Sequence, residues 1–281
     1  MRLRCQNMTP GGHAMFREHL NLLQSQGKRY FTFDQILQDL KISADSAKSG
    51  LYRMKKKGMI ITPAKGLYVI VPPEHRLLGS IPAEELAPIL MQYLQADHYV
   101  SLLSGACFYG ATHQKPASFQ IVTNKRIKHH LEFGYVKLEL FYKKNTKDLP
   151  YKNFMVDTGY LKVATPELVA IDLLTYLNRS GGLSHVATVL SELIESIDGD
   201  KLILLAKQIG EKYQLQRLGY ILEKIDTVAE DKKKSIVTKL ENYLNNKLKY
   251  YLPLVPEISG TGHPREKKWK IIENTNIESD L

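Results

Sequence analysis

The first quarter of the chain carries short apolar stripes at the spacing of amphipathic helices. Three apolar residues at intervals of four and three predict a first helix over residues 13–26: Phe16, Leu20 and Leu23. Thr32 and Gln35 are spaced as a capping box, in which each side chain accepts a hydrogen bond from the backbone N–H of the other residue. This box predicts that a second helix begins directly after Thr32.

A third helix is predicted to begin after the N-cap residue Ser43 and to end at Gly58. Its predicted buried stripe consists of Ala44, Ala47, Leu51 and Met54. The opposite face is polar and basic, with Asp45, Ser49, Tyr52, Arg53 and Lys56 at its centre and Ser46, Lys48 and Lys57 at its edges. This helix therefore presents a basic surface to solvent or to a partner.

A β-hairpin follows the third helix. Residues 59–62 and 67–71 are apolar, residues 63–66 have turn composition, and Pro72 and Pro73 close the second strand. Three helices and a hairpin in this order predict a winged helix-turn-helix over residues 13–73. The preceding residues, 1–12, are expected to be a disordered lead-in, with Met8 and Met15 as alternative starts.

The third helix of a winged helix-turn-helix fits the major groove of double-stranded DNA. We expect Ser46, Ser49 and Tyr52 to contact base edges, and Arg53 to reach a guanine. The expected phosphate contacts come from Lys48, Lys55, Lys56 and Lys57, with Lys65 at the tip of the wing meeting the DNA backbone or the minor groove. The alternative is a winged helix that docks a protein, whose lysines are merely solvated.

Residues 74–281 predict a mixed α/β domain that becomes mostly helical toward its C-terminus, which places the whole chain in the α+β class. Predicted elements are a helix over 82–94, a closely packed helix within 99–112, and strands at 119–123, 135–142 and 158–163. From Thr165-Pro166 onward, apolar stripes predict one helix after another.

The last segment, residues 253–281, contains the single tryptophan, Trp269. We expect Trp269, Ile271 and Ile272 to pack against the second domain as an extended strand, because a large indole is seldom left in water. The alternative is an untethered tail.

Charge is distributed unevenly between the two predicted domains. Residues 1–73 contain twelve of the 39 lysines and arginines but only four of the 29 acidic residues. Most of the formal net charge of +10 therefore lies in the winged helix, which favours a polyanionic partner over a basic surface without a role. With two cysteines and no apolar run long enough to span a bilayer, we expect a cytoplasmic protein with no membrane contact.

Catalytic motifs are missing from the sequence. The nine histidines include no HExxH pattern, and the side chains of the adjacent residues His129 and His130 are expected to diverge. There is no GxSxG, no phosphate-binding loop and no paired-aspartate strand of a nucleotidyltransferase. We therefore expect no enzyme activity, no metal site and no cofactor.

Several stretches make the chain resemble the AbiEi family of antitoxins. In order they are Arg29–Asp34, Gly66–Pro73, Gly105–Pro116, Thr158–Glu167, Gly181–Leu190, Gln216–Tyr220 and Lys268–Glu273. The resemblance implies a winged helix that represses its own operon at promoter repeats. It also implies a larger antitoxin domain that counteracts a nucleotidyltransferase toxin similar to AbiEii in a type IV toxin–antitoxin, or phage-defence, system. Whether this requires direct contact with the toxin is left open, and so are the operator sequence and the oligomeric state.

Two other functions compete with this one. The first is a stand-alone transcription regulator whose C-terminal domain senses a small ligand. The second is an enzyme that its winged helix tethers to DNA. A neighbouring gene for a nucleotidyltransferase would favour the antitoxin, because a lone regulator needs none.

Overall fold

The structure is a computed structural model that describes residues 12–112 and 115–277. The chain divides into two compact units. The first contains the residues up to 96 together with 128–138 and 155–160, and the second contains 97–127, 139–154 and the residues from 161. The predicted domain boundary between residues 73 and 74 stays a prediction. The predicted lead-in lies outside the described residues except for Gly12, at which the first helix begins.

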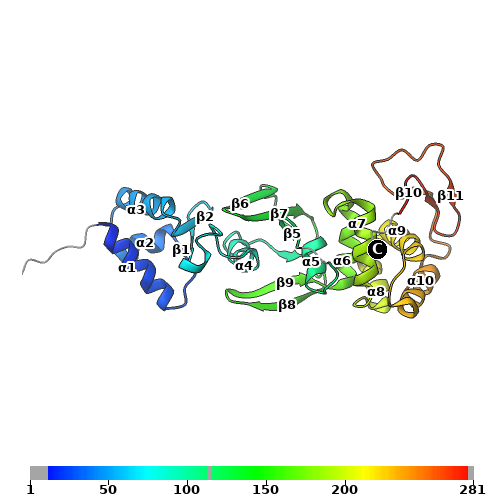
Figure 1. The fold of residues 1–281 in the computed structure, drawn as a ribbon, viewed down its shortest axis with the longest axis horizontal. Helices are drawn as coiled ribbons and strands as arrows, with labels where there is room; N and C mark the ends of the chain where they lie inside the picture. The colour runs from blue at the N-terminus through cyan, green and yellow to red at the C-terminus, as the bar shows by residue number, and fades with distance from the viewer. Residues whose placement is uncertain (1–11, 113–114, 278–281) are drawn as a thin grey trace, which may run out of the picture. The chain divides into compact units, whose positions relative to one another are not determined.

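The N-terminal part of the first unit is a winged helix-turn-helix, as predicted (Figure 1). Its helices are α1 (Gly12–Ser25), α2 (Phe33–Leu40) and α3 (Ala44–Lys56). Its three-stranded sheet has the order β1-β3-β2, formed by β1 (Tyr30–Thr32), β2 (Ile60–Ala64) and β3 (Leu67–Ile70). The strand β1 was not predicted, because three residues are too few to show a strand periodicity. The hairpin turn is also shorter than predicted, since β2 extends through Pro63 to Ala64.

Local side-chain hydrogen bonds fix where α2 and α3 begin. The backbone N–H of Thr32 donates to Gln35 Oε1 at 2.7 Å, and the Gln35 N–H donates to Thr32 Oγ1 at 3.3 Å, which confirms the capping box. Ser43 Oγ accepts from the Ser46 N–H at 3.3 Å and so caps α3 as predicted. Between the two helices, Lys41 takes a left-handed conformation with φ of 51°.

Close packing between α1 and α3 corrects the predicted stripe. Ala47, Leu51 and Met54 are buried as predicted, but Ala44 is exposed and Gly50 is buried in its place. A Cβ atom added at Gly50 would lie 2.2 Å from Cε2 of Phe16, whose ring is itself buried in the winged-helix core. Only glycine therefore lets α1 approach α3 so closely.

The rest of the first unit supports the wing. It contains a short 3-10 helix, Pro73–His75, and the helix α4 (Ala83–Tyr93), close to the predicted 82–94. The Tyr135 N–H donates to the Leu78 carbonyl at 2.9 Å, and Thr158 Oγ1 donates to the Glu85 carbonyl at 2.9 Å. Residues 128–138 and 155–160 are thereby held to the segment that follows the wing.

After α4, the chain forms a six-stranded sheet with the strand order β6-β7-β5-β4-β9-β8. Its strands are β4 (His98–Val100), β5 (Phe119–Thr123), β6 (His130–Phe133), β7 (Val136–Tyr142), β8 (Tyr151–Val156) and β9 (Gly159–Ala164). The predictions of β5, β7 and β9 are confirmed, and β6 and β8 were missed. The helix predicted within 99–112 is shorter than expected, because β4 occupies its beginning and α5 spans only Leu102–Cys107.

Helices follow the sheet, as predicted from Thr165 onward (Figure 1). They are α6 (Pro166–Thr175), the 3-10 helix Leu177–Arg179, α7 (Gly182–Leu193), α8 (Gly199–Ile209), α9 (Lys212–Lys224) and α10 (Glu230–Leu244). The helix α8 was not predicted. Among the described residues, no helix combines the length and the apolar character that crossing a membrane requires.

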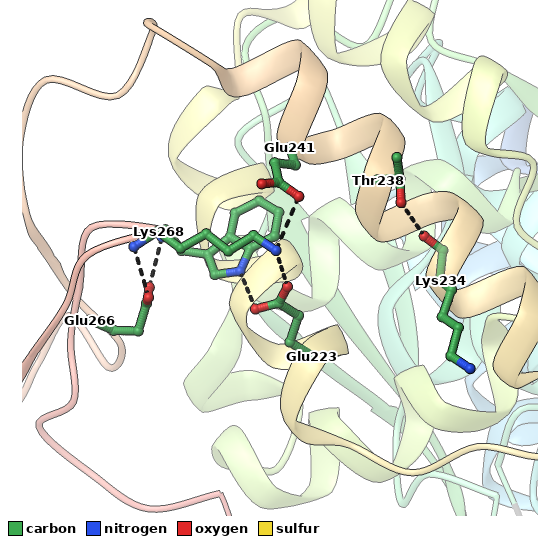
Figure 2. A network of polar contacts seen from close by, with 7 residues as sticks. Glu223, Lys234, Thr238, Glu241, Glu266 and Lys268 are labelled. Carbon is green, nitrogen blue, oxygen red and sulfur yellow. Dashed lines mark hydrogen bonds and ion pairs between the residues drawn. The ribbon is translucent and has the colours of Figure 1, made fainter.

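The C-terminal segment packs against these helices in three short strands, β10 (Leu252–Pro253), β11 (Arg265–Glu266) and β12 (Ile271–Ile272). Trp269 is 1% exposed, and its indole N–H donates to Glu223 Oε2 at 2.7 Å. Lys268 forms ion pairs with Glu223 and Glu241, so that both acidic side chains hold the segment (Figure 2). The predicted packing of Trp269 is therefore confirmed, but the predicted extended strand is confined to Ile271 and Ile272, because Trp269 lies in the turn between β11 and β12.

A buried polar network crosses the core of the second unit. Asp172 on α6 is fully buried and accepts from Lys143 Nζ and from Ser101 Oγ, each at 2.8 Å. Burial, and then the Asp172 carboxylate, raise the pKa of the nearby Tyr99 hydroxyl. These contacts compensate the Asp172 charge and turn the Lys143 ammonium group inward.

Candidate nucleic-acid interface

All nine residues predicted to contact DNA are exposed. Eight belong to α3 and its C-cap, and the ninth lies at the β2–β3 turn. They are Ser46, Lys48, Ser49, Tyr52, Arg53, Lys55, Lys56, Lys57 and Lys65. The helix and the wing that were predicted to carry the interface are thus present and accessible.

The outward face of α3 is polar along its whole length. At 100° per residue, Ser49, Tyr52 and Lys56 lie opposite the buried stripe that contains Leu51 and Met54. Tyr52 is 68% exposed, so its hydroxyl and ring edge are available to a partner. A face with donors and acceptors at its centre and cations beside them has the composition needed to contact base edges and phosphates.

Positive charge is concentrated in the C-terminal half of α3. Arg53, Lys55 and Lys56 occupy the last turn of the helix, where they also interact favourably with the helix dipole. The single acidic residue of the helix, Asp45, lies in the first turn and is 3.4 Å from Lys48 Nζ in an exposed ion pair. Lys48 must therefore leave or share Asp45 before it can contact a phosphate, which makes it a weaker candidate than the three later cations.

The tip of the wing is held by α4. The hydroxyl of Tyr93 donates to the Lys65 carbonyl at 2.8 Å, while the Lys65 side chain stays exposed. The next residue, Gly66, has φ of 84°, and a Cβ atom there would lie 2.9 Å from the Tyr93 hydroxyl. Tyr93 thus fixes the turn from which Lys65 projects. Sequence reasoning missed this role, because nothing in the pattern of α4 indicates contact with a residue so distant in sequence.

A histidine lies behind the interface. His19 on α1 is buried, and its Nε2 is 3.4 Å from Asp39 Oδ2 on α2. Burial lowers the pKa of His19, and nearby Lys28 lowers it further, while Asp39 opposes the shift. The packing of α1 on α2 therefore favours a neutral imidazole.

The histidine pair of the first unit differs from the prediction. The ring centres of His129 and His130 lie 4.4 Å apart, so the two side chains converge rather than diverge. Their side chains meet because His129 precedes strand β6 and does not share the alternation of an extended strand.

Two sequence families match this chain. Residues 19–71 match a family described as "Transcriptional regulator, AbiEi antitoxin". Residues 99–224 match a family described as "AbiEi antitoxin C-terminal domain". Both descriptions name an antitoxin, the first also names a transcriptional regulator, and neither names an enzyme. A search among curated proteins gives no match.

One solved structure shares the fold over almost the whole chain. The RV2827C protein from Mycobacterium tuberculosis aligns with a TM-score of 0.64 over 92% of this chain and 90% of that chain, at 16% identity. An antigenic nucleotidyltransferase-like protein from Paracoccidioides brasiliensis aligns with a TM-score of only 0.36, over 56% of this chain and 90% of that chain, at 12% identity. The first similarity shows the fold, and the second is too low to support a comparison.

Proposed function

Because the chain belongs to the AbiEi antitoxin family, we propose that it represses its own operon through α3 and the wing and counteracts a partner nucleotidyltransferase toxin. The family establishes an antitoxin with a DNA-binding regulator domain. The promoter, the identity of the toxin and a cytoplasmic site of action are parts of the proposal.

The basic outer face of α3 is the observation that carries promoter binding. Its cations lie on a helix whose opposite face is closely packed on α1, so the helix is held rigidly in place. The net charge of residues 1–73 supplies the long-range attraction to DNA. The proposed contacts are the nine exposed residues of α3, its C-cap and the wing: Ser46, Lys48, Ser49, Tyr52, Arg53, Lys55, Lys56, Lys57 and Lys65.

The test replaces Arg53, Lys56 and Lys57 by alanine together and measures binding to the operon's own promoter by gel shift at several salt concentrations. Each lost phosphate contact should flatten the plot of log affinity against log salt by about 0.9. A control replaces three exposed lysines of the second unit: Lys201, Lys234 and Lys249. Equal affinity in both variants, with unchanged circular dichroism, would rule out α3 as the DNA-binding element.

Antitoxin activity is tested by co-expression with the product of the adjacent gene. The complete chain should restore growth when that gene encodes a nucleotidyltransferase toxin. The Arg53/Lys56/Lys57 variant separates the two activities: it should lose repression, and any rescue that remains does not require promoter binding. Promoter binding without rescue by any neighbouring gene product would favour a stand-alone regulator.

A further inference from the structure

Two loops of the second unit begin side by side at one end of the sheet. The first, residues 124–127, follows β5, and the second, residues 143–148, follows β7. The Lys143 N–H donates to the Thr123 carbonyl at 2.9 Å, which joins the two points where the strands end. The two loops therefore form one surface.

This surface is strongly basic in a part of the chain that is nearly neutral. Residues 74–281 contain 27 lysines and arginines against 25 acidic residues, whereas the loops 124–127 and 143–148 contain five cations and one acid, Asp148. Lys143 points inward to Asp172. The other four cations are exposed: Lys125, Arg126, Lys144 and Lys147.

An aromatic ring lies among these cations. Tyr142, the last residue of β7, is 43% exposed, and Cζ of Arg126 lies 4.8 Å from the centre of its ring. The guanidinium group of one loop thus covers part of an aromatic face at the start of the other. We call Lys125, Arg126, Tyr142, Lys144 and Lys147 together the sheet-end surface.

Asp97, directly before β4, fixes both loops. Its carbonyl accepts from the Asn124 N–H at 3.1 Å, and its own N–H donates to Asn124 Oδ1 at 3.1 Å. Its carboxylate accepts from Thr146 Oγ1 at 2.7 Å and lies 3.5 Å from Lys162 Nζ. One residue therefore anchors the loop after β5 and the loop after β7, so the cations are held on an ordered backbone.

We propose that the sheet-end surface binds an unpaired stretch of nucleic acid. Four exposed cations, one of them a guanidinium group 4.8 Å from the centre of the Tyr142 ring, match the two requirements of single-strand binding: positive charge along the phosphates and a flat face on which a base can stack. A duplex offers phosphates but keeps the faces of its bases stacked inside, so it cannot use Tyr142. An acidic protein surface would use the cations and has no requirement for the ring.

The experiment uses the full chain and fluorescent homopolymers of about 12 nucleotides, within the usual site size of such surfaces. Oligo-U and oligo-dT distinguish RNA from DNA, and a mixed-sequence duplex of equal length serves as competitor. The protein is also tested with Arg53, Lys56 and Lys57 replaced by alanine, so that binding through the winged helix is removed. Single-strand binding should survive in this variant, which keeps the inference independent of promoter binding.

Two variants test the surface itself. Replacing Lys125, Arg126, Lys144 and Lys147 by alanine should abolish detectable binding, whereas the matched control with Lys201, Lys234, Lys249 and Lys267 replaced should keep it. Tyr142→Leu should weaken binding about tenfold and Tyr142→Phe should not, because stacking needs the ring and not the hydroxyl. The proposal is overturned if no single strand binds, if the duplex competes as well as the single strand, or if Tyr142→Leu binds like Tyr142→Phe. Binding of the partner toxin that depends on the four cations but not on Tyr142 would identify a protein-docking surface instead.

Discussion

Replacing Trp269 tests how strongly the C-terminal segment is fixed to the helices of the second unit. The indole is 1% exposed, and its ring lies over Gly219, where a Cβ atom would come within 2.2 Å of Cζ3. Removing so large a buried aromatic side chain costs about 3–5 kcal/mol of unfolding free energy. The hydrogen bond from the indole N–H to the Glu223 carboxylate is lost as well and accounts for part of this cost. We expect Trp269→Ala to destabilise the second unit by about 4 kcal/mol.

Trp269→Phe separates the ring from the N–H. It keeps an aromatic side chain over Gly219 but removes the donor to Glu223, so the expected loss is about 2 kcal/mol. Both variants are compared with the wild type by guanidinium unfolding followed by far-UV circular dichroism, with midpoints and slopes fitted separately.

The wild type offers an independent readout, because its single tryptophan reports one site. Native emission should be shifted to the blue and should move to the red with the unfolding transition. The packing described here would be refuted by native emission at the wavelength of free indole. A loss below about 1 kcal/mol in Trp269→Ala would refute it equally.

Three further predictions concern the first unit. Gly50→Ala should destabilise the winged helix by about 1–3 kcal/mol, measured by thermal unfolding, because the added methyl group collides with the buried ring of Phe16. Tyr93→Phe should weaken promoter binding by freeing the turn that carries Lys65; in a Lys65→Ala background the same change should have no further effect in a gel shift. Because burial lowers the pKa of His19, this histidine binds a proton more readily in the unfolded chain than in the folded chain. The unfolding free energy should therefore be greatest above the ordinary histidine pKa of 6.5 and should fall as the pH drops below it. In His19→Gln, the unfolding midpoint should fall less between about pH 7.5 and 5.5.

A matched change controls the Gly50→Ala test, and each of the three tests has an outcome that would contradict it. Ser49→Ala alters a neighbouring exposed position of α3 and should leave the unfolding midpoint of the winged helix close to that of the wild type. Equal midpoints for Gly50→Ala and Ser49→Ala would contradict the packing argument. Additive effects of Tyr93→Phe and Lys65→Ala on promoter affinity would show that Tyr93 does not act through Lys65. If the unfolding midpoint of His19→Gln depends on pH as that of the wild type does, the pH dependence arises from other groups.

Local signals in the sequence were sufficient for the winged helix. The capping box of Thr32 and Gln35 and the N-cap Ser43 each involve residues within one helical turn, so their spacing alone predicts the hydrogen bonds that form. The exposed face of α3 follows from the same short-range periodicity. The misplaced stripe has a different cause: Ala44 is the exposed first residue of α3, whereas Gly50 is buried against the ring of Phe16, a contact with another helix that the periodicity of α3 does not show.

Features that join distant parts of the chain could not be predicted. Ser101, Lys143 and Asp172 form a buried network, yet no periodicity relates a residue after β4, a residue after β7 and a residue on α6. The sheet-end surface has the same character, because its two loops become neighbours only through the strand order. The packing of Trp269 was predictable because it depends on the size and apolar character of one side chain rather than on a pairing.

The division of the chain has a consequence for how the protein is made. The first unit includes residues 128–138 and 155–160, so it is interrupted twice by segments of the second unit. A ribosome releases residues in order, and the winged helix therefore emerges long before the last parts of its own unit. Until residue 158 has left the exit tunnel, the Leu78 and Glu85 carbonyls cannot both have their partners. A message cut short before that codon yields a chain in which α3, the proposed DNA-contacting helix, lacks part of its supporting unit, and we expect cellular proteases to remove this chain before it can bind DNA.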